Sequence, residues 1–273
     1  MPNLGALLGR GEQTDAYDTP ITPPDYAFAV WAPIFAGCLA STAGQCLPAG
    51  RTDPLSRRTG WPLAGAYALN AAWSLAAQTG RFAYTPYLLP AAAALAATAH
   101  VRLQPLPPSP GLLAVTPVST GLLLGWTTLA SAVNIVAARR ARDTPGVVAA
   151  ATAGLSVVAA AVSAGVSRSR RGGLPVALAA AWGLGTLATM RSRPGVVRAV
   201  AAFGATAVAA AGLRPARRTA SRCRAAGIAP AQTGRARAHT AANRRPLREP
   251  RRHRPPTGAS GIVAGSVSPR GRT

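Results

Sequence analysis

The feature that most constrains the fold is a series of long apolar runs with almost no charged residues inside them. A bilayer core of about 30 Å is crossed by roughly 20 apolar residues in a helix. Short arginine clusters separate most of the runs, which predicts an all-α, multi-pass transmembrane helical bundle with about seven spans. The runs fall near residues 26–48, 60–79, 84–102, 112–138, 147–167, 174–190 and 196–213.

The last three runs are the weakest because they consist mostly of alanine, valine and glycine. Two of them could instead pair as one re-entrant or interfacial unit. A soluble, alanine-rich helical protein is the alternative for the whole chain, and the near absence of charge inside the runs disfavours it.

Prolines 33, 90 and 117 fall inside runs, where neighbouring helices in a bundle satisfy the freed carbonyls. Gly37, Ser41 and Gly44 are spaced to let two helices approach closely.

The charge of the chain is concentrated in its C-terminal part. The formal net charge is +23, all 30 basic residues are arginines, and half of them lie beyond Leu213. Residues 214–273 contain no Phe, Trp or Tyr, so this tail cannot bury enough surface to fold and is predicted to be disordered. The favoured interpretation is a tail held near anionic lipid headgroups. The second interpretation is that part of the tail is an artefact of translation, with a composition that no fold constrains. Binding to nucleic acid is disfavoured, because stacking on bases needs aromatic side chains.

These patterns divide the chain into four parts: a polar segment (1–25), a membrane core (26–138), additional membrane helices (139–213) and the arginine- and proline-rich tail (214–273). The first part has no recognisable signal peptide, since its LGALL stretch is too short. Seven spans place the two ends on opposite sides of a cell membrane. The arginine count of the tail favours the cytoplasm for the C-terminal end.

The residues needed for most chemistry are missing from the predicted spans. None of the seven acidic residues lies in a span, whereas a proton-coupled transporter normally needs one there. A retinal Schiff base needs a lysine, and the chain has none. No catalytic set or metal-ligand spacing is found, so neither catalysis nor a metal site is expected. His100 is expected to lie at the membrane interface, at the end of a span.

Aromatic and amide residues recur within the spans at helical spacing. Trp126, Ala130 and Asn134 are four residues apart and share one helix face, and Asn70 and Trp73 are three apart. Interfacial anchoring of each Trp and interhelical hydrogen bonding of each Asn is the alternative interpretation, and it suits Trp61 at the start of a span. Otherwise these residues predict a shared inward pocket, in which Ala130 leaves volume for a ligand. The predicted ligand-binding residues are Trp31, Asn70, Trp73, Trp126, Ala130 and Asn134.

Three stretches resemble the TspO/MBR family of tryptophan-rich sensory proteins, also called the translocator protein family. They are TPITPPDYAFAVWAPIF at 19–35, LNAAWS at 69–74 and GWTTLASAVN at 125–134. The family pattern combines a Pro-Pro-aromatic-Phe-Val-Trp segment, a Leu-Asn-x-x-Trp-Ser segment and a Trp followed eight residues later by Asn. The resemblance covers about residues 12–213 and is closer to a longer branch with further helices after the core.

The resemblance implies a helical membrane bundle that binds tetrapyrroles such as porphyrin or haem, or sterols, in a sensory or regulatory role. No cofactor is expected, and porphyrin or haem is counted as a possible ligand. The leading hypothesis is therefore a membrane receptor or sensor for a small hydrophobic ligand. A permease or transporter subunit for a small apolar molecule is the alternative. The expected partners are the lipid bilayer and that ligand, and a homodimer is left open.

Overall fold

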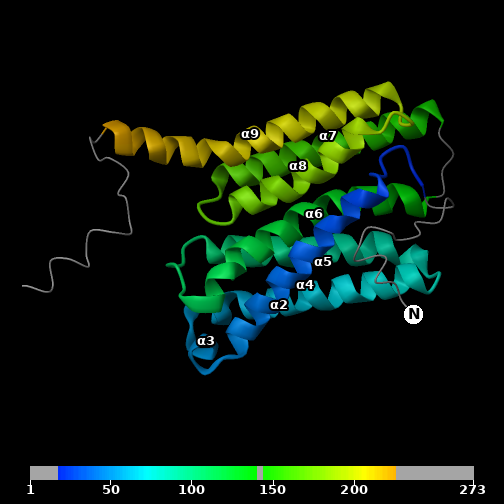
Figure 1. The fold of residues 1–273 in the computed structure, drawn as a ribbon. Coiled ribbons are helices and arrows are strands. Elements are labelled where there is room, and N and C mark those ends of the chain that lie inside the picture. The colour runs from blue at the N-terminus through cyan, green and yellow to red at the C-terminus, as the bar shows by residue number, and fades with distance from the viewer. Residues whose placement is uncertain (1–17, 140–143, 226–273) are drawn as a thin grey trace, which may run out of the picture. The chain divides into compact units, whose positions relative to one another are not determined.

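The computed structural model describes residues 18–139 and 144–225, with side chains as far as Arg214. The chain divides into two compact units, Met1–Gly227 and Ile228–Thr273, and every described element belongs to the first. The predicted all-α helical class is confirmed, because the described residues form helices and no strands (Figure 1). The α-helices are α2 (Trp31–Cys46), α3 (Pro48–Thr52), α4 (Pro54–Gln78), α5 (Thr85–Leu103), α6 (Thr116–Ala138), α7 (Pro145–Arg168), α8 (Gly173–Thr189) and α9 (Gly195–Ala225).

Each predicted apolar run corresponds to one of the long α-helices, and the short α3 lies between the first two runs. Four helical segments of the described residues are long and apolar enough to cross a membrane: Asp25–Cys46, Gly111–Ala138, Pro145–Arg168 and Gly195–Arg214. Gly173–Thr189 is a shorter apolar helix. Helices α7, α8 and α9 are three separate helices, and their pairing as a re-entrant or interfacial unit stays an alternative prediction.

Two of the three prolines within the runs lie in the first turn of a helix and not in its interior. Pro33 is the third residue of α2 and Pro117 lies in the first turn of α6, where a missing backbone N–H costs little. A 3-10 helix precedes each of them: η2 (Asp25–Val30) before α2 and η4 (Gly111–Val115) before α6. Pro90 does lie inside α5, as expected, and Pro62 lies inside α4.

Helix α6 lies at the centre of the packing and contacts α2, α5, α7 and α8 (Figure 1). In its most apolar 18-residue window 61% of the residues are buried, against 28–33% in the other three candidate spans. The outer helices instead expose large apolar side chains such as Leu39, Trp61 and Phe203. This pattern suits a bundle whose outer surface faces lipid and whose interior is organised around α6.

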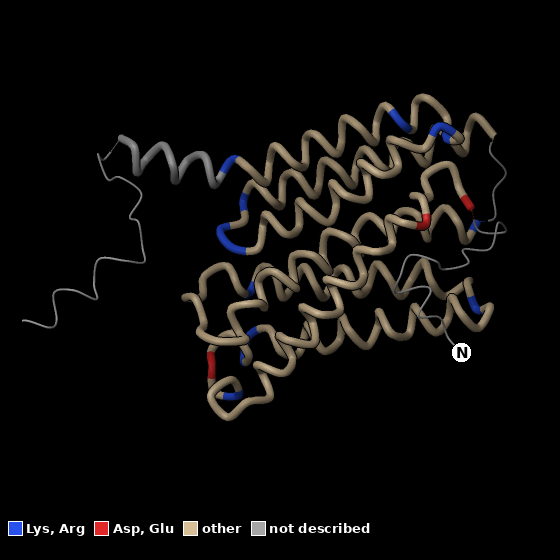
Figure 2. Tube along the Cα trace, in the orientation of Figure 1, with Lys and Arg blue, Asp and Glu red and all other residues tan. Residues whose placement is uncertain are grey.

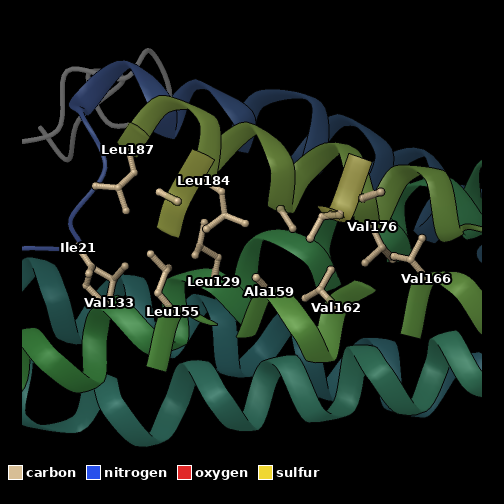
Figure 3. Close-up of a cluster of buried hydrophobic side chains, with 14 of the residues drawn as sticks. Ile21, Leu129, Val133, Leu155, Ala159, Val162, Val166, Val176, Leu184 and Leu187 are labelled. Carbon is tan, nitrogen blue, oxygen red and sulfur yellow. The ribbon is translucent and has the colours of Figure 1, made fainter. Parts of the chain in front are cut away.

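Two apolar clusters pack against α6 and α8. The aliphatic cluster joins α6, α7 and α8 through side chains such as Leu129, Leu155 and Leu184 (Figure 3). Helix α9 adds side chains such as Val197 to it. The aromatic cluster joins η2, α2, α4, α5, α6 and α8, and its buried members are Ala27, Trp31, Ile34, Ala66, Ala96, Leu123, Trp126 and Ala179.

The close packing predicted for the small residues of α2 is confirmed. A Cβ added to Gly37 would lie 2.9 Å from Ser119 Cβ, and one added to Gly44 would lie 3.0 Å from Leu112 Cβ. Between these two contacts, the Ser41 and Thr116 hydroxyl oxygens are 2.8 Å apart and hydrogen bonded. The seam formed by Gly37, Ser41 and Gly44 therefore holds α2 directly against η4 and α6.

The charged residues of the described chain gather near the helix ends (Figure 2). Asp18 pairs with Arg193 in the α8–α9 connection, with a shortest N···O distance of 2.6 Å. At the other end, the Gln104 side chain accepts hydrogen bonds from the backbone N–H groups of Arg170 (2.8 Å) and Arg171 (3.0 Å). These contacts tie segments that are far apart in the sequence.

His100 is buried at the end of α5, and its predicted position at the membrane interface stays a prediction. Only 7% of this residue is exposed, and its Nε2 lies 2.8 Å from Ser169 Oγ. The α7–α8 connection covers the end of α5, which the sequence pattern of α5 alone did not show.

Helix α9 runs past Leu213 to Ala225, so its last turns fall within the segment for which disorder is predicted. The rest of that segment, residues 226–273, lies outside the described residues, as do residues 1–17. The predicted disorder of the tail and the polar N-terminal segment therefore remain predictions.

Candidate functional site

The six predicted site residues come from three helices that meet beside η2. Trp31 is the first residue of α2 and follows directly on η2, which begins after Pro24. Asn70 and Trp73 belong to α4. Trp126, Ala130 and Asn134 follow one another at intervals of one turn along α6. All except Trp73 are at most 8% exposed, so the face predicted from their spacing does point into the protein.

The three tryptophans form a ring assembly centred on Trp31. The Trp31 ring lies 5.8 Å from Trp73 and 6.1 Å from Trp126, the latter edge to face at 82°. Phe28 stands edge to face on Trp126 at 5.6 Å, and Phe35 stacks on Trp31 at 5.1 Å. These separations lie in the 4.5–7 Å range in which aromatic pairs attract one another. The structure therefore brings together aromatic residues from η2, α2, α4 and α6.

A hydrogen bond between side chains connects α4 to α6 beside these rings. Trp73 Nε1 donates to Asn134 Oδ1 at 3.0 Å. The amide nitrogen of Asn134 donates to the Ala130 carbonyl at 2.8 Å, which fixes the side chain against its own helix. Asn134 is thus oriented by one bond and joined to Trp73 by the other.

Two buried polar atoms in the same region have no hydrogen-bond partner among the described residues: Asn70 Oδ1 and Trp126 Nε1. Tyr67 and Trp73 both pack against the aromatic cluster, and Asn70 lies between them on α4. A buried polar atom without a partner is costly, and more so in a membrane interior without water. These atoms give the site unused capacity for hydrogen bonding.

Trp182 of α8 is a member of this region that the sequence did not single out. Its Nε1 donates to the Ala27 carbonyl of η2 at 2.9 Å, and its ring lies edge to face on Tyr26 at 6.3 Å. The only signal was a tryptophan within a run otherwise made of small and aliphatic residues. Nothing local in the sequence indicated that α8 packs against η2.

Two cavities lined by described residues involve none of the predicted six. One of about 590 Å³ lies between α5, α6 and α7, and one of about 510 Å³ lies between α7 and α9. Trp31 and Trp126 are only 5% and 1% exposed because their rings fill the space between the helices. Ala130 is 8% exposed and lines neither cavity, so open volume beside it stays a prediction. A ligand would enter this region by moving the rings apart.

Within the described chain, no group of three or more His, Cys, Asp or Glu side chains is placed to hold a metal ion. Cys38 and Cys46 are free thiols. The chemistry that the six residues offer consists of aromatic faces, an indole N–H and carboxamides. Such groups bind a flat apolar molecule with a few polar atoms.

Comparison with known proteins gives one family. A family model described as TSPO-like protein matches residues 7–214, which is more than half of the chain. No curated protein and no solved structure matches the sequence.

Proposed function

The chain belongs to the TSPO-like protein family, and we propose that it is a membrane sensor that binds a small hydrophobic ligand between α2, α4 and α6. Its helices and its family make it a membrane protein with the lipid bilayer as partner. The proposed ligand is of the tetrapyrrole or sterol class, and the proposed residues are Trp31, Asn70, Trp73, Trp126, Ala130 and Asn134.

The observation that carries the proposal is the set of unpartnered polar atoms among packed aromatic rings. Asn70 Oδ1 and Trp126 Nε1 are buried without a hydrogen-bond partner in the described structure. A ligand with one donor and one acceptor would satisfy both and recover part of their desolvation cost, about 1–3 kcal/mol for each group. The indole faces would stack on a flat ring system, as in apolar ligand sites with a few placed polar groups.

Ligand binding in this site would change the contacts between α2, α4 and α6. A ligand placed between Trp31 and Trp73 competes for the space that the rings occupy at 5.8 Å. Separation of these rings would also strain the 3.0 Å bond from Trp73 to Asn134, which joins α4 to α6. We therefore propose that ligand binding shifts α4 relative to α6. The six residues supply no nucleophile or general base, so the proposal is a binding function without catalysis.

The test is a titration of the purified full chain with haem and with protoporphyrin, followed by tryptophan fluorescence. Saturable quenching is expected for the wild type. The variants Trp73→Phe and Asn134→Leu should weaken binding severalfold, because each removes a group that is proposed to contact the ligand. Trp61→Phe is the matched control, since Trp61 is 86% exposed on the outer face of α4 and should leave the affinity unchanged.

Ala130→Leu tests the same face of α6 by adding side-chain volume to it. The variant should abolish saturable binding while the protein still folds, because the larger side chain would occupy the volume that the ligand is proposed to take up. Wild-type affinity in folded Ala130→Leu, Trp73→Phe and Asn134→Leu proteins would exclude this site. Ligand flux across vesicles that contain the wild-type protein would instead favour a permease.

A further inference from the structure

The cavity of about 590 Å³ between α5, α6 and α7 is a groove on the lateral surface of the bundle. Its residues Ile135 and Val157 are 40% and 68% exposed, so the groove opens toward the surrounding lipid. Its α6 wall runs from Thr128 to Arg139, and Gly154 lines it from α7. It shares no residue with the six proposed for the ligand site.

The length of the groove corresponds to one leaflet of a bilayer. Thr128 and Arg139 are eleven residues apart, which is about 16 Å along a helix that rises about 1.5 Å per residue. Half of a bilayer core of about 30 Å is about 15 Å. Arg139 caps the C-terminal end of α6, where the helix leaves the apolar region. The groove thus begins near the middle of the membrane and ends at one surface.

The chemistry of the groove is that of an amphiphile with a negative head. Among the described residues that line it, Arg139 is the one that carries a charge. The two hydroxyls of the lining are bonded to carbonyls of their own helix, Thr128 to Leu124 at 2.7 Å and Ser131 to Thr127 at 2.6 Å. The remaining wall is apolar. A cation at the membrane surface above an apolar groove is complementary to an anionic headgroup above an acyl chain.

We propose that this groove binds one anionic phospholipid, with an acyl chain between α5, α6 and α7 and the headgroup phosphate on Arg139. A bilayer lipid reaches the groove sideways without crossing a barrier, because the opening faces the hydrocarbon. The headgroup then lies level with Arg139, and the chain fills the groove down to Thr128.

Native mass spectrometry of the delipidated full chain tests the proposal, with phosphatidylglycerol and phosphatidylcholine of identical acyl chains as probes. The first bound phosphatidylglycerol should be retained about fivefold more strongly than phosphatidylcholine, the effect of one arginine near a lipid surface. Arg139→Gln should remove this preference. Arg81→Gln is the charge control, since Arg81 is an exposed arginine that does not line the groove. It lies in the connection between α4 and α5, which is at the same end of the bundle as the C-terminal end of α6 (Figure 1).

A second pair of variants tests the groove itself. A Cβ added to Gly154 meets nothing within 4 Å, so Gly154→Leu places its side chain in the groove without a clash. Gly165→Leu on the same helix also enters open space but lies outside the groove, and it is the matched control. Gly154→Leu should lose the first bound lipid of either headgroup, and Gly165→Leu should retain it.

Equal retention of the two lipids by the wild type, or a preference that survives Arg139→Gln, would overturn the proposal. So would wild-type lipid binding by Gly154→Leu. Haem titration of Gly154→Leu distinguishes the two proposals. Loss of the bound lipid with an unchanged response to haem supports the lipid groove, and this result does not depend on whether the aromatic site binds haem.

Discussion

At the scale of single residues, the bond from Trp73 to Asn134 does most to define the arrangement of the aromatic region. Asn134 is 5% exposed on α6, and its acceptor is used by an indole on α4 at 3.0 Å. In a bilayer interior, neither group finds water as a substitute partner. The pair therefore fixes one relative position of α4 and α6 as well as contributing energy.

A double-mutant cycle measures that contribution. Trp73→Phe, Asn134→Leu and the double variant should show a coupling free energy of about 0.6 kcal/mol, and at most about 1.7 kcal/mol, the range measured for hydrogen bonds between membrane helices. Thermal or denaturant unfolding in detergent gives the values. Additive effects of the two substitutions would show that the bond is not formed in solution.

The residues of the site differ in how far the sequence could predict them. The i, i+4 spacing correctly placed Trp126, Ala130 and Asn134 on one inward face, because a helix repeats every 3.6 residues. The partner of Asn134 could not be predicted in this way, since Trp73 lies 61 residues earlier. The same limitation hid Trp182, whose acceptor on Ala27 is 155 residues away.

At the scale of elements, the seam of small residues on α2 determines how closely that helix approaches α6. Without Cβ atoms at Gly37 and Gly44, the two backbones come near enough for Ser41 and Thr116 to hydrogen bond at 2.8 Å. Close contact of this kind replaces the hydrophobic effect as the source of helix association in lipid. The position of Trp31 depends on it, since Trp31 belongs to the same helix.

Gly37→Leu should destabilise the folded protein by about 1–3 kcal/mol, because its Cβ alone would lie 2.9 Å from Ser119 Cβ and α2 would have to move outward. Unfolding of the purified variant in detergent measures the loss. Gly165→Leu is the control, since the space around Gly165 is open. A stability of Gly37→Leu equal to that of the control would mean that α2 does not pack through this seam.

Element positions were predictable because apolar length alone determines where a membrane helix can lie. The start of α4 was less well predicted, although a capping signal was present there, as it was at the start of α7. Asp53 accepts a hydrogen bond from Leu55 N at 2.8 Å and Thr144 accepts one from Val147 N, and a proline follows each cap. A capping residue followed by proline is a known start of a helix, but hydropathy alone places the start of α4 at residue 60 and not at Pro54.

At the scale of the whole molecule, the packing order of the helices is not the order of the sequence. Helix α6 packs against α8, and α7 packs against α9, so each of these pairs skips a helix in the chain (Figure 1). Hydropathy could not predict this, because lipid-facing and partner-facing alanine, valine and glycine look alike in a sequence. In particular, the sequence did not predict that α8 packs against both apolar clusters.

Truncation after Ala225 should leave membrane insertion and thermal stability unchanged within error. The removed residues contain no aromatic side chain and so contribute little packing. Truncation before Gly195 should prevent stable folding, because α9 buries Val197, Ala201 and Val208 completely in the aliphatic cluster. A large loss of folded protein after the shorter deletion would contradict the predicted disorder of the tail.

Reporter fusions test the orientation. Helices α2, α4, α5, α6, α7, α8 and α9 alternate in direction, so the described chain begins at one end of the bundle and α9 finishes at the other (Figure 1). Fusions to the two termini should therefore report opposite compartments, with the C-terminal reporter in the cytoplasm because half of the arginines follow Leu213. Two reporters in the same compartment would require an even number of crossings.

The contacts of the N-terminal segment with α8 and its connection to α9 impose an order on biosynthesis. Ala27 accepts a hydrogen bond from Trp182, and Asp18 pairs with Arg193, which lies 175 residues later. A ribosome adds roughly 5–20 residues per second, so Trp182 emerges about 8–31 s after Ala27. Throughout that interval the first span resides in the bilayer without the residues that finally cover its start. The beginning of the chain is therefore among the last parts of the protein to be completed.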